Sequence, residues 1–221
     1  MKILTWFAPA LLWAVASLAP TTLEAAPIVD QSYDAVADGS SGGINVESDQ
    51  QLAQTFTVGV TGTLVTVEVQ ARVSTVFPPG GDLLLDIRPT VDGVPVEDDS
   101  LALASVAVPV ADVPPFVPWT GNFVSVDLSP FSVHVTAGEV LAIVLRQSGT
   151  GSYIWLSQVE PEGVTYAKGA GFSRRFDPSW GRLIPETDFG FRTSVVPEPA
   201  TLALIGLGLV GIGAMRRRKQ S

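Results

Sequence analysis

The chain has 221 residues, with no cysteine, one histidine and two methionines, and its 22 acidic and 13 basic side chains give a net charge of −9. The missing sulfur excludes a disulfide scaffold, a thiolate metal cluster and a cysteine nucleophile, and a single histidine excludes sites built from several histidines. The 21 glycines and 17 prolines favour many turns over long helices, so an all-β protein is expected.

The N-terminus has the features of a secretory signal peptide, expected as a helix within residues 1–25. A positive start at Lys2 precedes an apolar run over residues 3–19, and small residues follow it. Ala25 is the preferred cleavage position, because the neighbouring alternatives would leave a proline just beyond the cut. A retained membrane helix is the alternative, although the run is short for one. The segment therefore predicts export through the Sec translocon and cleavage by signal peptidase.

Side chains that carry oxygen crowd the stretch that follows. They are Asp30, Asp34, Asp38, Asn45, Glu47 and Asp49. Calcium prefers carboxylate and amide oxygens, and secreted β-proteins often bind it through loops. No EF-hand pattern is present, so two interpretations stay open: a structural Ca²⁺ site that uses Asp30, Asp38, Asn45 and Glu47, or a solvated acidic segment. No other cofactor is expected.

Alternating apolar and polar residues predict strands through the middle of the chain. Strands are expected at residues 54–58, 64–73, 83–88, 101–108, 124–128, 140–145, 153–157, 164–168 and 189–193. The run at 140–145 is apolar on both faces, which indicates a central strand. Clusters of proline, glycine and aspartate separate the strands. The pattern predicts one extracytoplasmic domain over residues 26–194, an antiparallel jelly-roll-like β-sandwich.

Five aromatic side chains are candidates for stacking on sugar rings. They are Trp119, Tyr153, Trp155, Tyr166 and Trp180. Tyr153 and Trp155 share one face of a predicted strand, a spacing that core packing would also produce. Trp119 and Trp180 lie in turn-forming segments, which makes them the better candidates for exposed contacts with a polysaccharide.

Catalytic residue types are present without a catalytic arrangement. His134 lies on a predicted strand, and no Gly-x-Ser-x-Gly elbow places it near a serine. Asp98 with Asp99, or Asp82 with Asp86, would need carboxyl groups about 5–10 Å apart for glycoside hydrolysis, a separation that sequence does not give. Solvent-facing strand and loop residues are the simpler interpretation. We therefore expect a protein that is not an enzyme.

Charge is distributed unevenly along the chain. Without residues 1–25 and 197–221, the remaining 171 residues carry 20 acidic and 8 basic side chains, a net charge of −12. Residues 26–158 hold 15 of these acidic side chains but only 3 of the basic ones. Such a charge repels phosphate backbones, so nucleic acid is not an expected partner.

The last 25 residues combine a proline motif, an apolar run and a basic cluster. Pro197-Glu198-Pro199 precedes an apolar run over residues 200–215, and the chain then continues with Arg216, Arg217, Arg218 and Lys219. At about 1.5 Å per residue the run extends about 24 Å, less than the roughly 30 Å hydrocarbon core, so it predicts a minimal transmembrane helix. The basic tail, 216–219, should stay in the cytoplasm, which places the preceding domain outside it.

These three elements, in this order, resemble the PEP-CTERM sorting signal of Gram-negative bacteria. The resemblance covers residues 195–221 and implies recognition by exosortase, a membrane-embedded transpeptidase-like enzyme that cuts near Pro197, Glu198 and Pro199. It implies an inner-membrane-anchored precursor with its body in the periplasm, and a mature form at the cell surface or outside the cell. A permanent anchor is the alternative. The preceding domain is similar to β-sandwiches attached to interchangeable C-terminal anchors.

Exosortase systems accompany exopolysaccharide production and biofilm formation. The resemblance therefore implies a non-enzymatic secreted or surface protein with a structural or adhesive role in the extracellular polysaccharide matrix. The alternative is a carbohydrate-binding module that recognises exopolysaccharide through the aromatic candidates above. A hydrolase is the third hypothesis, and it would need turnover that depends on a single carboxylate.

Overall fold

Period-two patterning produces an all-β structure. The computed structural model describes residues 25–36, 42–117, 122–159, 166–176 and 178–198, and these contain sixteen strands, three single-turn 3₁₀ helices and no α-helix. The strand pairings are antiparallel. Residues 26–198 form one compact unit, which we call the body. The predicted all-β class and antiparallel sheets are confirmed, and the jelly-roll order of the strands stays a prediction.

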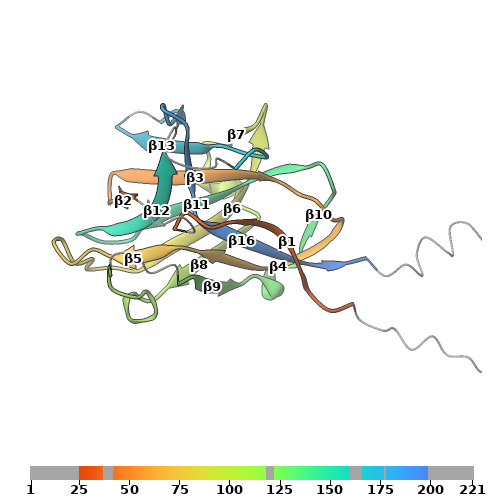
Figure 1. The fold of residues 1–221 in the computed structure, drawn as a ribbon, viewed down its shortest axis with the longest axis horizontal. Coiled ribbons are helices and arrows are strands. Elements are labelled where there is room, and N and C mark those ends of the chain that lie inside the picture. Colours follow the sequence, from red (N-terminus) through yellow and green to blue (C-terminus); the bar gives the residue numbers. More distant parts are fainter. Residues whose placement is uncertain (1–24, 37–41, 118–121, 160–165, 177, 199–221) are drawn as a thin grey trace, which may run out of the picture. The chain divides into compact units, whose positions relative to one another are not determined.

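Three sheets make up the body (Figure 1). The first runs β1 (Ile28–Tyr33), β16 (Phe191–Pro197), β4 (Gly62–Val69) and β10 (Val133–Val135), with β9 (Val124–Asp127) also paired to β4. The second runs β14 (Gly181–Arg182), β13 (Gly171–Arg175), β3 (Gln50–Thr57), β11 (Val140–Gln147), β6 (Leu83–Val91) and β7 (Val94–Pro95), with β8 (Ala104–Val108) also paired to β6. The third runs β15 (Thr187–Phe189), β12 (Tyr153–Val159) and β2 (Gly42–Val46), with β5 (Ala71–Val73) also paired to β12.

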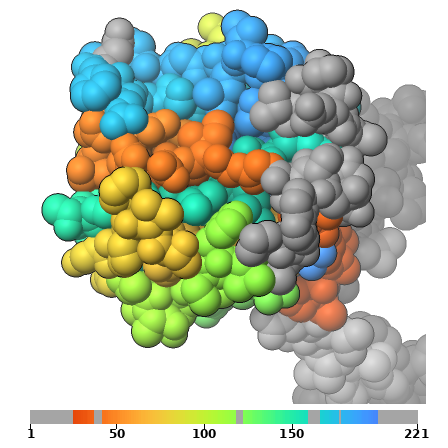
Figure 2. Space-filling model, turned by 60° about the vertical axis from the view of Figure 1, so that its left-hand side comes forward, coloured from red at the N-terminus to blue at the C-terminus, as the bar shows by residue number. Residues whose placement is uncertain are grey.

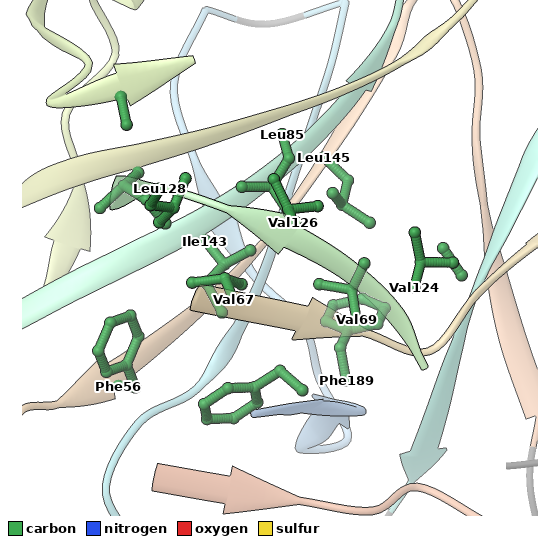
Figure 3. Close-up of a cluster of buried hydrophobic side chains, with 14 of the residues drawn as sticks. Phe56, Val67, Val69, Leu85, Val124, Val126, Leu128, Ile143, Leu145 and Phe189 are labelled. Atoms are coloured by element: carbon green, nitrogen blue, oxygen red, sulfur yellow. The ribbon is translucent and has the colours of Figure 1, made fainter. Parts of the chain in front are cut away.

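The larger of two hydrophobic clusters in the described residues joins the sheets. Alternate side chains of β4, β6 and β11 point into it, among them Val67, Leu85 and Ile143, and Figure 3 shows them close together. These three side chains are fully buried. Burying an aliphatic side chain of this size contributes about 1.5–3 kcal/mol to folding, so the alternation seen in the sequence is the main source of stability.

The predicted strand at 64–73 is two strands in two sheets, separated at Gln70. The Gln70 N–H donates to Gly190 O, and Gln70 O accepts from the Leu156 N–H, both at 3.0 Å. Its buried side chain accepts from the Ala35 N–H at 2.9 Å and donates to Asp34 Oδ1 at 2.7 Å. Because a buried amide is stable only when bonded, Gln70 fixes the point where the chain passes from the first sheet to the third.

Two other predicted strands also differ from the structure. At 101–108, a 3₁₀ helix over Asp99–Leu101 precedes β8, which begins only at Ala104. At 164–168, the described residues 166–168 contain a turn and no strand. Strands β1, β2, β7, β13 and β14 have no counterpart in the prediction. All but β13 lie at the edge of a sheet, where apolar alternation is weak.

Among the described residues, no helix is long and apolar enough to cross a bilayer. The predicted signal peptide helix up to residue 24 and the predicted transmembrane helix at 200–215, with the basic tail at 216–219, lie outside the described residues. The predicted boundary between body and sorting signal, at residue 194, falls inside β16, which continues to Pro197.

Candidate functional site

The Pro-Glu-Pro segment begins inside the first sheet. The last three residues of β16 pair with the start of β4 in the register Val195–Leu64, Val196–Thr63 and Pro197–Gly62. On its other side β16 pairs with β1, whose first paired residue, Ile28, lies opposite Val195. Proline has no N–H to donate, so it suits the last position of a strand. Pro197 and Glu198, the first two residues of the motif, are therefore part of the body.

Two further contacts hold Glu198 after the strand ends. The Glu198 N–H donates to Thr61 O at 3.3 Å. The His134 Nε2 lies 3.3 Å from Glu198 Oε1, and His134 is charged only when protonated. His134 is on β10 opposite Thr63, and its side chain is 59% exposed. The single histidine thus contacts the motif from the far side of β4. We call residues 61–64, His134 and residues 195–198 the sorting junction.

Gly62 allows the close approach of β16 to β4 at this junction. A Cβ at this position would lie 2.1 Å from Val196 O and 2.8 Å from a Val195 side-chain carbon. Real Cβ atoms do not come so close to a carbonyl oxygen, so a larger residue would force the strands apart. The sequence pattern gave no sign of this role, because Gly62 lies far along the chain from the motif.

Two of the aromatic candidates, Tyr153 and Trp155, lie in the core. Tyr153 and Trp155 are fully buried. Trp155 stacks on Phe189 with a centroid distance of 4.5 Å and donates from Nε1 to Gly190 O at 3.0 Å. The Tyr153 hydroxyl donates to Gly81 O at 2.7 Å, and burial raises the pKa of Tyr153 to about 12. Neither ring has a free face for a sugar, which corrects the expectation that they contact polysaccharide.

The other described candidates are also covered. Trp180 is 8% exposed, and the Arg174 guanidinium carbon lies 5.0 Å from its ring centroid. Tyr166 is buried and donates from its hydroxyl to Gln31 Oε1 at 2.8 Å. Trp119 lies outside the described residues. Since sugar stacking requires an exposed ring face, the described aromatic candidates do not form a stacking platform.

A groove of about 510 Å³ lies beside β3 and the start of β13. Six of the residues that line it are Thr55, Thr57, Lys168, Phe172, Trp180 and Arg182. Of the described residues around the groove, only Asp92 is acidic. A pair of carboxylates for acid–base hydrolysis is therefore missing from the described lining.

The carboxylates considered for catalysis belong to structural networks. Asp86 accepts hydrogen bonds from Arg88 at 2.7 Å, Arg146 at 2.9 Å and Ser105 at 2.7 Å. Burial by itself would raise the pKa of Asp86, but these hydrogen bonds outweigh it and the pKa is lowered. A carboxylate held ionised in this way is a poor general acid.

Asp98 and Asp99, the other acidic pair considered for catalysis, have different structural roles. Asp98 accepts from the Ser100 N–H at 2.9 Å and caps the 3₁₀ helix. Asp99 pairs with Arg88 at 2.7 Å and with Arg174 at 2.9 Å. Asp98 therefore stabilises the turn within the 96–103 segment, and Asp99 holds this segment against the second sheet.

The calcium candidates do not converge in the part of the chain that the structure describes. Asp30 accepts from the Gly59 N–H, at 3.0 Å from each carboxylate oxygen. Glu47 pairs with Arg175 at 2.7 Å and accepts from Asn45 at 3.4 Å. Asp38 lies outside the described residues, and within them no three Asp, Glu, His or Cys side chains come together to hold a metal. A structural Ca²⁺ site stays a prediction.

Comparison with known proteins identifies the C-terminal segment. Residues 195–219 match the family described as the PEP-CTERM protein-sorting motif, which confirms the resemblance stated above. A solved structure of a clostridial cysteine protease after propeptide cleavage is similar with a TM-score of 0.46 and 14% identity, over 73% of this chain and 41% of that chain. No curated protein matches the sequence. The motif marks an exported protein whose membrane-anchored precursor is processed by exosortase.

Proposed function

We propose that the body is displayed at the cell surface or released, and serves a structural or adhesive role in the extracellular polysaccharide matrix without catalysing a reaction. The observation that carries this proposal is the PEP-CTERM match at residues 195–219, whose first residues form the end of β16. Export would use the Sec translocon and signal peptidase, and exosortase would then remove the membrane helix after the Pro-Glu-Pro motif.

The chemistry of the described body supports a non-enzymatic role. Among the described residues, the buried Asp86 is paired with two arginines, and the buried Asp188 accepts hydrogen bonds from Gln54 Nε2 and the Tyr166 N–H. The described lining of the groove beside β3 holds a single acidic residue. Two apolar side chains, Phe176 and Ile184, are 88% and 87% exposed, which offers contacts to other matrix components. Exopolysaccharide or a protein bound to it is the expected partner.

Carbohydrate recognition is the second candidate, supported by the groove beside β3. Lys168 and Arg182 line this groove and would attract acidic sugars, and Trp180 also lines it. Binding of isolated exopolysaccharide that is lost in Trp180→Ala or Trp119→Ala, with the fold intact by circular dichroism, would favour this function over a purely structural role.

The sorting proposal is tested on the C-terminal peptide of the protein. Mass spectrometry of the mature wild-type protein is expected to find no residues from 200 to 221. Replacing Pro197, Glu198 and Pro199 with alanine should leave the precursor in the inner membrane. Pro130→Ala, in an exposed turn, is the matched control and should be processed normally. A mature wild-type protein that still ends at residue 221 would contradict the proposal.

A further inference from the structure

We infer that the pairing of β16 with β4 blocks the access of exosortase to the start of the Pro-Glu-Pro motif. The end of β16 must then separate from the start of β4 before exosortase can process the precursor. The inference rests on the proposed function and adds a control step to it. Gly62 would then be a positioning residue for a reaction that takes place at the neighbouring motif.

The backbone of the motif is already engaged. Val196 and Pro197 are in register with Thr63 and Gly62, and the Glu198 N–H is bonded to Thr61 O. An enzyme that cuts a peptide bond holds the substrate extended, through hydrogen bonds to the same backbone groups, with the reacting atoms in near-attack geometry. The groups that face β4 cannot make both sets of bonds at once. Release of this strand end therefore precedes productive binding.

The opening can be confined to the last few residues. The register between β16 and β4 shifts between Ser194 and Val195. Such an irregularity interrupts the ladder and leaves the pairs from Phe191 to Ser194 as a separate block. Chain ends open locally at much lower free energy than the whole domain. The segment 196–198 can thus leave the sheet while Val195 stays buried in the core and β16 stays paired to β1 and β4 upstream.

The pairing of β16 with β4 contributes more to the stability of the sorting junction than the His134–Glu198 ion pair does. The His134 and Glu198 side chains are 59% and 44% exposed, and exposed pairs of this kind contribute little. The close approach of the strands at Gly62, in contrast, requires a residue without a Cβ. Gly62→Ala should therefore open the junction, whereas His134→Ala should have a small effect.

The first experiment compares the rates at which full-length precursors are processed in cells, by pulse–chase labelling. Gly62→Ala is expected to speed conversion to the mature form by about threefold to tenfold, the gain expected from one or two weakened hydrogen bonds. Gly181→Ala is the matched control, because a Cβ there lies 3.7 Å from Ser173 O, an ordinary contact. Conversion of Gly62→Ala at the wild-type rate, with a folded body, would contradict the inference.

The second experiment closes the junction covalently and does not depend on Gly62. The chain has no cysteine, so Thr63→Cys combined with Val196→Cys can form only one disulfide, between residues that face each other across the ladder. Directly opposed strand residues lie about 4.5–5.5 Å apart, within the range that a disulfide spans.

The locked precursor should accumulate under oxidising conditions and mature when a reductant is added. Each single cysteine variant serves as a control and should mature like the wild type. If the wild type is processed and the locked variant matures equally fast, the inference is wrong and the proposed function stands. If the wild type is not processed at all, both are wrong.

Discussion

Asp86 is fully buried on β6 at the centre of a charged network. It bonds Arg88 and Arg146, and Arg88 in turn reaches Asp99 on the 96–103 segment. The Arg88 side chain is also fully buried, and its Nε has no hydrogen-bond partner among the described residues. Burying Arg88 and part of Arg146 this close together is tolerable only while a carboxylate lies between them.

Removing that carboxylate should destabilise the body strongly. We expect Asp86→Asn to lower the free energy of unfolding by about 3–5 kcal/mol at pH 7, because two buried or half-buried cations lose their common partner. Chemical denaturation measures the difference. Asp127→Asn, at the exposed end of β9, is the control and should change it little. A loss no larger than that of the control would show that the network is not needed for stability.

The lowered pKa of Asp86 also predicts how stability depends on pH. As the pH falls, the Asp86 carboxylate is protonated in the unfolded chain, where aspartate has a pKa of about 3.9, before it is protonated in the folded protein. The stabilisation is therefore complete above the pKa of the unfolded chain and is lost as the pH falls through the pKa of the folded state. Between pH 5 and pH 2 the wild type should lose stability more steeply than Asp86→Asn, and parallel curves would contradict this.

At the scale of elements, two loops close one end of the body. The Gly80 N–H donates to Thr150 O and the Ser152 N–H donates to Phe77 O, both at 2.8 Å. Figure 2 shows this end, with the gold 74–81 loop against the neighbouring teal segment. The two loops therefore behave as one packed layer.

Glycine at position 149 makes this packing possible. A Cβ on Gly149 would lie 2.7 Å from Gly81 N, so Gly149→Ala should lower the free energy of unfolding by about 1–3 kcal/mol through overpacking. Thermal unfolding monitored by circular dichroism gives the comparison. Gly42→Ala, where a Cβ would meet only Ser157 O at 3.9 Å, is the control. Equal melting temperatures for the two variants would contradict the account.

The sequence predicted the elements that bury one face. Residues 83–88 and 140–145 form parts of β6 and β11, because a strand with one face in the core must alternate or be apolar throughout. It did not predict the change of sheet at Gln70, since a buried amide and an exposed one look the same in a polar position. The spacing of Tyr153 and Trp155 was equally compatible with core and surface positions, and the structure places both side chains in the core.

Only the Pro-Glu-Pro part of the sorting junction could be predicted from the sequence. The Pro-Glu-Pro motif is local and could be identified from its own residues and those that follow. Its partners on β4 and β10 are distant in sequence, and nothing in the pattern around Gly62 or His134 pairs them with residues 195–198. Long-range register of this kind depends on the whole fold and leaves little trace in a single sequence.

At the scale of the whole molecule, the proposed processing would change the net charge. The full chain carries −9, residues 1–25 hold one acidic and one basic side chain, and residues 200–221 hold four basic and no acidic ones, which leaves −13 for residues 26–199. The mature protein should therefore elute later from an anion exchanger than its precursor, although it is smaller. Mass spectrometry of the fractions checks the assignment, and co-elution of the two forms would contradict it.

The place of β16 in the first sheet determines how the body would respond to mechanical load. The strand lies between β1 and β4 and leads directly to the C-terminal segment. A pull on that segment, as fluid flow would exert on a tethered protein, acts along the strand and shears the ladders on both sides together. Once the short end beyond Val195 has peeled away, rupture requires many hydrogen bonds to break at once, and survival under tension is governed by that unfolding rate.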